Sequence, residues 1–136
     1  MKMRKFRAHF FKIALFLIFL LTVSCKQKGI VQFCEGTDKD GKPVKCGSVF
    51  TSGDITLILE SKDPFASEKL RVKIFNEDSG SAKPEETKFL EVEPSSKTAR
   101  IDLSMYNPGN YRVTAENMDG KILTQGKVQI INDINP

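Results

Sequence analysis

The feature that most constrains the fold of this chain is a two-residue alternation of apolar and polar side chains, which recurs between residues 54 and 131. The clearest case is residues 69–76, in which Leu70, Val72 and Ile74 alternate with polar or charged side chains. Turn-forming residues interrupt the alternation roughly every 8–12 residues. A period of two places every second side chain on one face of an extended chain, so the pattern predicts strands rather than helices.

The number of these stretches predicts the fold class. Together with a short apolar pair, the alternating stretches make about seven strands. They lie at residues 49–50, 54–60, 69–76, 88–93, 98–105, 110–116 and 121–131. Many short strands separated by turns are typical of an all-β, antiparallel sandwich, which would occupy residues 47–136. Gly126 lies inside the last stretch and predicts a bulge or a break there.

Residues 107–113 (Asn-Pro-Gly-Asn-Tyr-Arg-Val) indicate which kind of sandwich the chain forms. With the turn at residues 118–120, they resemble the last hairpin of immunoglobulin-like and fibronectin-III-like domains in exported bacterial proteins. The resemblance implies a fold and no activity. Tyr111 is either a corner tyrosine, with its hydroxyl on nearby backbone, or a plain core aromatic. The chain has no Trp, and no cysteine pair links the two predicted sheets, so strict antibody-type membership is not expected.

Residues 1–24 predict export through the Sec pathway. A basic head precedes an uncharged apolar run at residues 13–23, which is the layout of a cleaved signal peptide and is short for a membrane span. Ser24-Cys25 then resembles the end of a bacterial lipobox, although Thr22 stands where Leu is usual. The overall layout is similar to spirochaetal lipoproteins. This resemblance implies a lipid, such as palmitate, on Cys25 and a place in the outer membrane or at the cell surface. An uncleaved signal anchor is the alternative.

The two other cysteines, Cys34 and Cys46, predict a disulfide, since an exported chain meets oxidising conditions. Asp40-Gly41 between them is a turn signal that brings the two ends together. We therefore expect a lipidated Cys25 with a tether over residues 25–33, followed by a disulfide-closed loop over residues 34–46. A zinc site lacks further ligands, and a calcium loop would need acidic groups where glycines stand.

Composition excludes several classes of function. Residues 1–24 hold five of the 21 basic residues, no acidic residue and the only His, so the remaining chain has 16 basic and 17 acidic residues and a net charge of −1. A chain of this charge is not expected to bind nucleic acid. Without His it lacks the usual general base, so we expect no enzyme and no cofactor beyond the lipid. Glu91 and Glu93, which the alternation places on one strand face, are interpreted as a solvated pair rather than an acid and base.

Two surfaces are candidates for binding. A basic cluster is predicted on one sheet face, and an exposed loop is predicted at residues 77–87. The predicted cluster consists of Lys69, Arg71, Lys73 and Lys88. We interpret the chain as a lipid-anchored, non-enzymatic module that binds another protein. The resemblance to spirochaetal lipoproteins implies a host-facing adhesin for matrix proteins or plasminogen. The alternatives are a periplasmic-side accessory subunit of an envelope complex and, less favoured, a small hydrolase.

Overall fold

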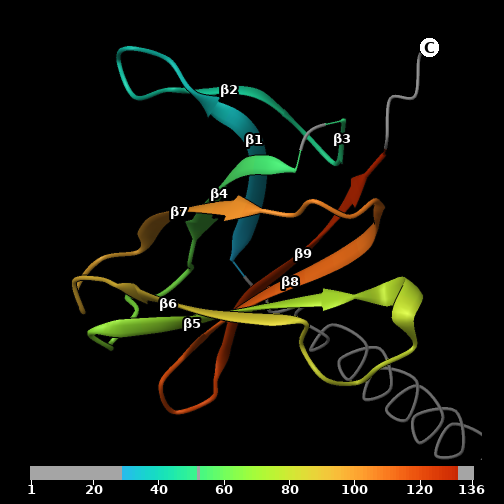
Figure 1. Cartoon of the computed structure of the whole chain (residues 1–136). Helices are drawn as coiled ribbons and strands as arrows, with labels where there is room; N and C mark the ends of the chain where they lie inside the picture. Colours follow the sequence, from blue (N-terminus) through green and yellow to red (C-terminus); the bar gives the residue numbers. More distant parts are fainter. Residues whose placement is uncertain (1–28, 52, 132–136) are drawn as a thin grey trace, which may run out of the picture.

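The computed structural model describes residues 29–51 and 53–131, which form nine β-strands and one 3₁₀ helix. The predicted all-β sandwich is confirmed, with two sheets packed face to face (Figure 1). Within these two ranges, no helix has the length and apolar character needed to cross a membrane. The predicted signal peptide and Cys25 lie outside the described residues, so the structure does not test the predictions about them.

One sheet has four strands in the order β2-β1-β4-β7, and every neighbouring pair is antiparallel. Its strands are β1 (Ile30–Thr37), β2 (Pro43–Gly47), β4 (Asp54–Glu60) and β7 (Thr98–Ser104). The alternation explains the last two strands, because Ile55, Leu57 and Leu59 of β4 and Leu103 of β7 are all buried on the inner side.

The other sheet has five strands in the order β3-β9-β8-β5-β6. Its strands are β3 (Val49–Phe50), β5 (Lys69–Asn76), β6 (Glu86–Glu91), β8 (Gly109–Asn117) and β9 (Ile122–Ile130). All pairs are antiparallel except β3 with β9, which is parallel. The 3₁₀ helix η1 (Glu77–Ser79) follows β5.

The core lies between the sheets and is built from the apolar half of each alternating strand. Leu70, Val72 and Ile74 of β5 are almost completely buried, and Tyr111 and Val113 of β8 pack in the same cluster. The Tyr111 hydroxyl donates a hydrogen bond to the backbone carbonyl of Asn107 at 2.7 Å. Of the two roles that the sequence left open, the structure therefore shows the corner tyrosine.

Residues 30–47 differ from the prediction of a tether followed by a separate loop. Residues 30–33 begin β1, which pairs with β4 from Ile30↔Glu60 to Cys34↔Thr56. Phe33 is buried in the core, and Cys34 is fully buried. The sandwich therefore begins near residue 30 rather than residue 47. Val31 and Phe33 are the only inward apolar positions here, which is too few for an alternation to be visible in the sequence.

Gly126 does not break β9, which runs through it in register with Val113 of β8. A Cβ at this position would approach the Val31 and Phe33 side chains of β1 to 3.0 Å. The glycine therefore allows β1 to pack closely over β9. The irregularity in this hairpin falls instead between Ala115 and Glu116 on β8.

The connections between strands gather at two ends of the sandwich. The proximal end is where the described chain starts at Gly29, and it contains the connections at residues 61–68, 92–97 and 118–121. The distal end contains η1 and residues 105–108 between β7 and β8, at the right of Figure 1. The strands between the two ends carry the candidate sites.

Candidate functional site

Three of the four predicted basic residues share the outer face of the five-stranded sheet. Lys69, Arg71 and Lys73 alternate along β5 with core residues, so their side chains leave the sheet on the side away from the four-stranded sheet. We call this surface the open face. It comprises Lys69, Arg71, Lys73, Phe75, Thr87, Phe89, Glu91, Arg112, Thr114, Glu116, Gln125 and Lys127.

Lys88 does not belong to the open face, which corrects the predicted cluster. It lies directly opposite Val72 in the β5–β6 register, and opposed residues of an antiparallel pair point to the same side of the sheet. Val72 is a core residue, so Lys88 is on the inner side of β6, where it pairs with Glu86 at 3.7 Å. Phe89 takes the outward position beside Arg71 instead.

Glu116 organises the two central cations of the open face. One of its carboxylate oxygens accepts hydrogen bonds from Arg71 at 2.7 Å and from Lys73 at 2.9 Å. Burial alone would raise the pKa of Glu116, but the hydrogen bonds and positive charges of Lys73 and Arg71 outweigh it and hold the pKa below its usual value. Arg71 and Lys73 therefore form a fixed, partly neutralised cluster with a buried carboxylate.

Two aromatic rings on the open face each lie beside an arginine. The guanidinium of Arg71 is 5.9 Å from the centre of the Phe89 ring, and that of Arg112 is 4.1 Å from the centre of the Phe75 ring. Both separations are within the range of cation–π attraction. Arg112 is also held by Glu77 at 3.2 Å. The Phe89 side chain is 58% exposed.

The open face offers groups for ion pairing, hydrogen bonding and aromatic contact. It carries five cations and two carboxylates, interleaved with two phenylalanines. The alternation identified Arg71 and Lys73 but missed Phe89 and Glu116. The sequence did contain a signal for Phe89. Adjacent residues of a strand point to opposite faces of the sheet, so Phe89 and Lys88 cannot both lie on the open face. Among the described residues, no group of three His, Cys, Asp or Glu side chains could hold a metal ion.

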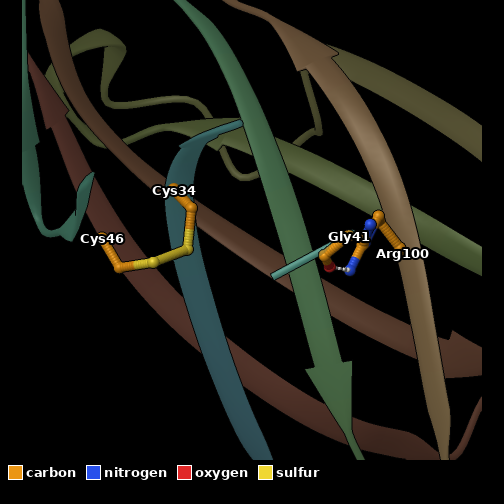
Figure 2. The surroundings of a disulfide bond; sticks show 4 residues. All are labelled: Cys34, Gly41, Cys46 and Arg100. Atoms are coloured by element: carbon orange, nitrogen blue, oxygen red, sulfur yellow. Dashed lines mark hydrogen bonds between the residues drawn. A yellow bond between two sulfur atoms is a disulfide. The ribbon is translucent and has the colours of Figure 1, made fainter. Parts of the chain in front are cut away.

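The predicted disulfide is confirmed on the outer face of the other sheet, the closed face, formed by Gln32, Cys34, Cys46, Thr56, Ile58, Arg100 and Asp102. Cys34 and Cys46 stand directly opposite each other on β1 and β2, with 2.05 Å between the sulfur atoms. On the next strand, the Thr56 hydroxyl donates to Asp102 at 2.8 Å. Figure 2 shows the disulfide and, across β4, the hydrogen bond from Arg100 to the carbonyl of Gly41 at 3.0 Å.

In the hairpin turn between β1 and β2, the side chain of Asp38 is bonded to backbone amides of the turn itself. The Asp38 carboxylate accepts hydrogen bonds from the amides of Asp40 and Lys42, both at 2.9 Å. Gly41 has a positive φ of 77°, which suits glycine. The β8–β9 turn repeats this arrangement, with the Asn117 side chain accepting from the amides of Asp119 and Lys121. Asp38 therefore has a structural role in this turn.

The predicted loop at residues 77–87 is shorter than expected and partly ordered by local bonds. η1 occupies its start, and β6 begins at Glu86. Asp78 accepts from the backbone amide of Asn110 at 2.8 Å, and this bond, with that from the Asn110 side chain, lowers the pKa of Asp78. The loop is thereby tied to β8. The strand β6 ends at Glu91, so Glu93 lies beyond it and the two predicted carboxylates are not on one strand.

No family model matches the chain, and the search of curated proteins found no match. Among solved structures, the soluble domain of PmoD from Methylocystis sp. ATCC 49242 (Rockwell) is similar at 16% sequence identity and a TM-score of 0.48. The similarity covers 78% of this chain and 98% of that one.

Proposed function

We propose that this chain is a lipid-anchored envelope protein that binds another protein through its open face and performs no catalysis. The observation that carries this proposal is Phe89, a half-exposed aromatic ring set beside the Arg71–Glu116–Lys73 cluster. Aromatic residues and arginine are the types enriched at protein interfaces and at their energetic centres. An exposed ring next to a fixed arginine is therefore suited to anchor a partner.

The cluster also lowers the cost of binding. A free arginine side chain loses rotamer freedom when a partner immobilises it, and this loss opposes association. Here Glu116, which is almost completely buried, already holds Arg71 and Lys73. The partner then meets a surface whose charged side chains are set before contact. Phe89 contributes apolar area with only two side-chain torsions to fix.

The charges of the open face indicate the chemistry of the partner. Its cations outnumber its carboxylates by five to two, counted over the residues that define it. A partner surface with an apolar centre and acidic residues around it would complement this arrangement. Contacts with such a partner would form faster at low ionic strength, because rim charges act mainly on the association rate.

The anchor rests on the sequence, in which Cys25 ends an apolar run after a small residue. We propose that it carries lipid, such as palmitate, and holds the domain at the outer membrane or cell surface after Sec export. A Cys25→Ala variant is expected to accumulate as uncleaved precursor and to lose labelling with radioactive palmitate. Normal labelling of this variant would remove the lipoprotein from the proposal.

The binding face is tested by comparing two exposed aromatic residues. Three full-length proteins, the wild type and the variants Phe89→Ser and Tyr106→Ser, are each cross-linked in cells and then purified. Tyr106 is 80% exposed but lies on the distal connection between β7 and β8, so it controls for the loss of any exposed ring. We expect a cross-linked protein that is lost in Phe89→Ser and retained in Tyr106→Ser. Loss in both variants, or in neither, would contradict a site on the open face.

The same face could serve a host-facing adhesin or an accessory subunit on the periplasmic side of an envelope complex. Digestion of intact cells with a protease separates these. A surface protein would be degraded in intact cells, whereas a periplasmic-side subunit would be protected until the outer membrane is permeabilised. Complete protection would remove matrix proteins and plasminogen as partners and direct the search to envelope proteins.

A further inference from the structure

We infer that the proximal end of the sandwich is a membrane-contacting surface that rests in the headgroup layer of a phospholipid bilayer. The inference rests on the proposed lipid anchor and adds an orientation to it. The strands would run along the membrane normal, and the open face would be at the side of the domain, facing neither toward the membrane nor directly away from it. Two features support this orientation: the point at which the chain enters the sandwich and the side chains that surround that point.

The entry point is fixed in the structure. The amide of Gly29 donates to the carbonyl of Leu123 at 3.3 Å, and the Thr124 hydroxyl donates to the carbonyl of Gly29 at 2.9 Å. A Cβ at Gly29 would collide with the carbonyl oxygen of Glu60, so the chain passes closely between the end of β4 and the start of β9. This point belongs to the sandwich and cannot move away from the proximal end independently.

The distance from the anchor to this point is short. Cys25 precedes Gly29 by four residues, which span about 14 Å at most when fully extended. The strands are longer, because the nine residues of β9 extend about 30 Å at 3.3 Å per residue. A lipidated Cys25 therefore keeps the proximal end at the membrane surface, while the distal end can reach the membrane only if the domain lies down.

The side chains around the entry point suit an interfacial position. Three large aliphatic side chains are exposed there, Ile30 at 63%, Met118 at 45% and Ile122 at 41%. Ile30 comes from the four-stranded sheet, Ile122 from the five-stranded sheet, and Met118 from the turn between β8 and β9. A cleft of about 430 Å³ brings Gly29, Pro64 and Ile122 to one surface. Apolar side chains on several sides of the anchor point can enter the boundary between headgroups and acyl chains.

The proximal end is close to neutral, which sets the kind of lipid contact. Its connections contain three lysines and four acidic residues. These are Lys62, Lys97, Lys121, Asp63, Glu68, Glu93 and Asp119. Electrostatic attraction to anionic lipid is therefore small for the folded part, and the contact depends on apolar burial. The orientation is expected in vesicles of neutral phosphatidylcholine and should change little with salt.

The chain has no Trp, so a single introduced Trp reports on one position. Lipidated full-length protein carrying Met118→Trp, Ile122→Trp or Tyr106→Trp is reconstituted into phosphatidylcholine vesicles with bromine atoms near the headgroup end of the acyl chains. We expect strong quenching and a blue-shifted emission for the first two variants. The distal Tyr106→Trp should be unaffected. Circular dichroism confirms that each variant is folded, and intact mass confirms lipid on Cys25.

Each other outcome overturns the inference. Lipidated protein without quenching at residues 118 and 122 would leave the anchor in place and exclude the proximal contact. Equal quenching at all three positions would mean that the domain lies on its side. A blue shift without quenching would mean that another protein, such as a second copy, covers this end. A mass without lipid would remove both the anchor and the orientation.

Discussion

The outer faces of the two sheets differ in how their side chains are bonded and in which of them remain exposed. On the closed face, a disulfide joins the buried Cys34 to the exposed Cys46, Thr56 is bonded to Asp102, and Arg100 donates to the β1–β2 turn. On the open face, Glu116 is buried instead, but the cations that cover it stay at the surface beside a half-exposed Phe89. The closed face uses its polar groups to bind its own elements together.

This difference supports the choice of the open face as the surface proposed to bind a partner. The bonds of the closed face join β1, β2, β4 and β7 to one another, so displacing them would cost stability. The Arg71–Glu116–Lys73 cluster also joins strands, but it leaves an aromatic ring and net positive charge at the surface. Substitutions on the closed side are therefore expected to lower stability, whereas those on the rim of the open face are expected to change binding.

The largest expected effect lies under the closed face, at Phe33 of β1. Phe33→Ala removes a core ring that packs near Gly126 of β9, and large-to-small changes of this kind cost about 3–5 kcal/mol. Urea denaturation of the purified domain measures the loss. A change within the error of the wild-type value would mean that β1 is not part of the core.

Removing the disulfide should have the next largest effect. Cys34 and Cys46 are 12 residues apart, and closing a loop of this size contributes about 3 kcal/mol through the entropy of the unfolded chain. We expect the Cys34→Ala, Cys46→Ala double variant to lose that amount and to keep its β-type circular dichroism. Titration of free thiols in the oxidised wild type should find neither Cys34 nor Cys46 reactive. Complete unfolding of the double variant would show that the bridge decides the fold.

Glu116→Gln tests the buried carboxylate of the open face. It keeps the shape but removes the charge that faces Arg71 and Lys73, and hydrogen bonds to charged groups contribute about 2 kcal/mol. Because the pKa of Glu116 is lowered in the folded chain, the unfolded chain binds its proton first as the pH falls. The stabilisation is present above the pKa of the unfolded chain and is lost as the pH falls through the lowered pKa of the folded chain.

This pH dependence has a direct measurement. Unfolding free energies of wild type and Glu116→Gln are compared between neutral and acidic pH. The two curves should be separate at pH 7 and converge towards the low pH at which Glu116 is protonated in both states. A constant difference across the range would mean that the charge of Glu116 does not stabilise the fold.

Phe89→Ala should have the smallest effect on stability. The ring is more than half exposed, and surface substitutions away from buried features usually change stability by no more than about 0.5 kcal/mol. Thermal unfolding of the purified variant measures this. A loss as large as that of Phe33→Ala would assign Phe89 to the core of the protein and remove it from the binding surface.

The sequence predicted those parts of the fold that depend on local pattern. The alternation placed Leu70, Val72 and Ile74 inside and Arg71 and Lys73 outside, and the cysteine pair predicted the bridge. It missed what depends on pairing between distant strands. Lys88 changed sides because its position is set by register with Val72, and Gly126 is explained by the approach of β1 from almost a hundred residues earlier. The approach of β1 is not visible within β9, whereas the inner side of Lys88 is indicated along its own strand by the alternation with Phe89.

The central claim, that the open face binds a protein, is tested most directly by photo-crosslinking in living cells. A photoreactive amino acid replaces Phe89 on the open face or Ser104, an exposed residue on the outer side of β7. We predict an adduct of defined mass from position 89, absent from position 104, and lost when the variant at position 89 also carries Arg71→Glu. Equal adducts from both positions, or an adduct from position 104 alone, would contradict the claim.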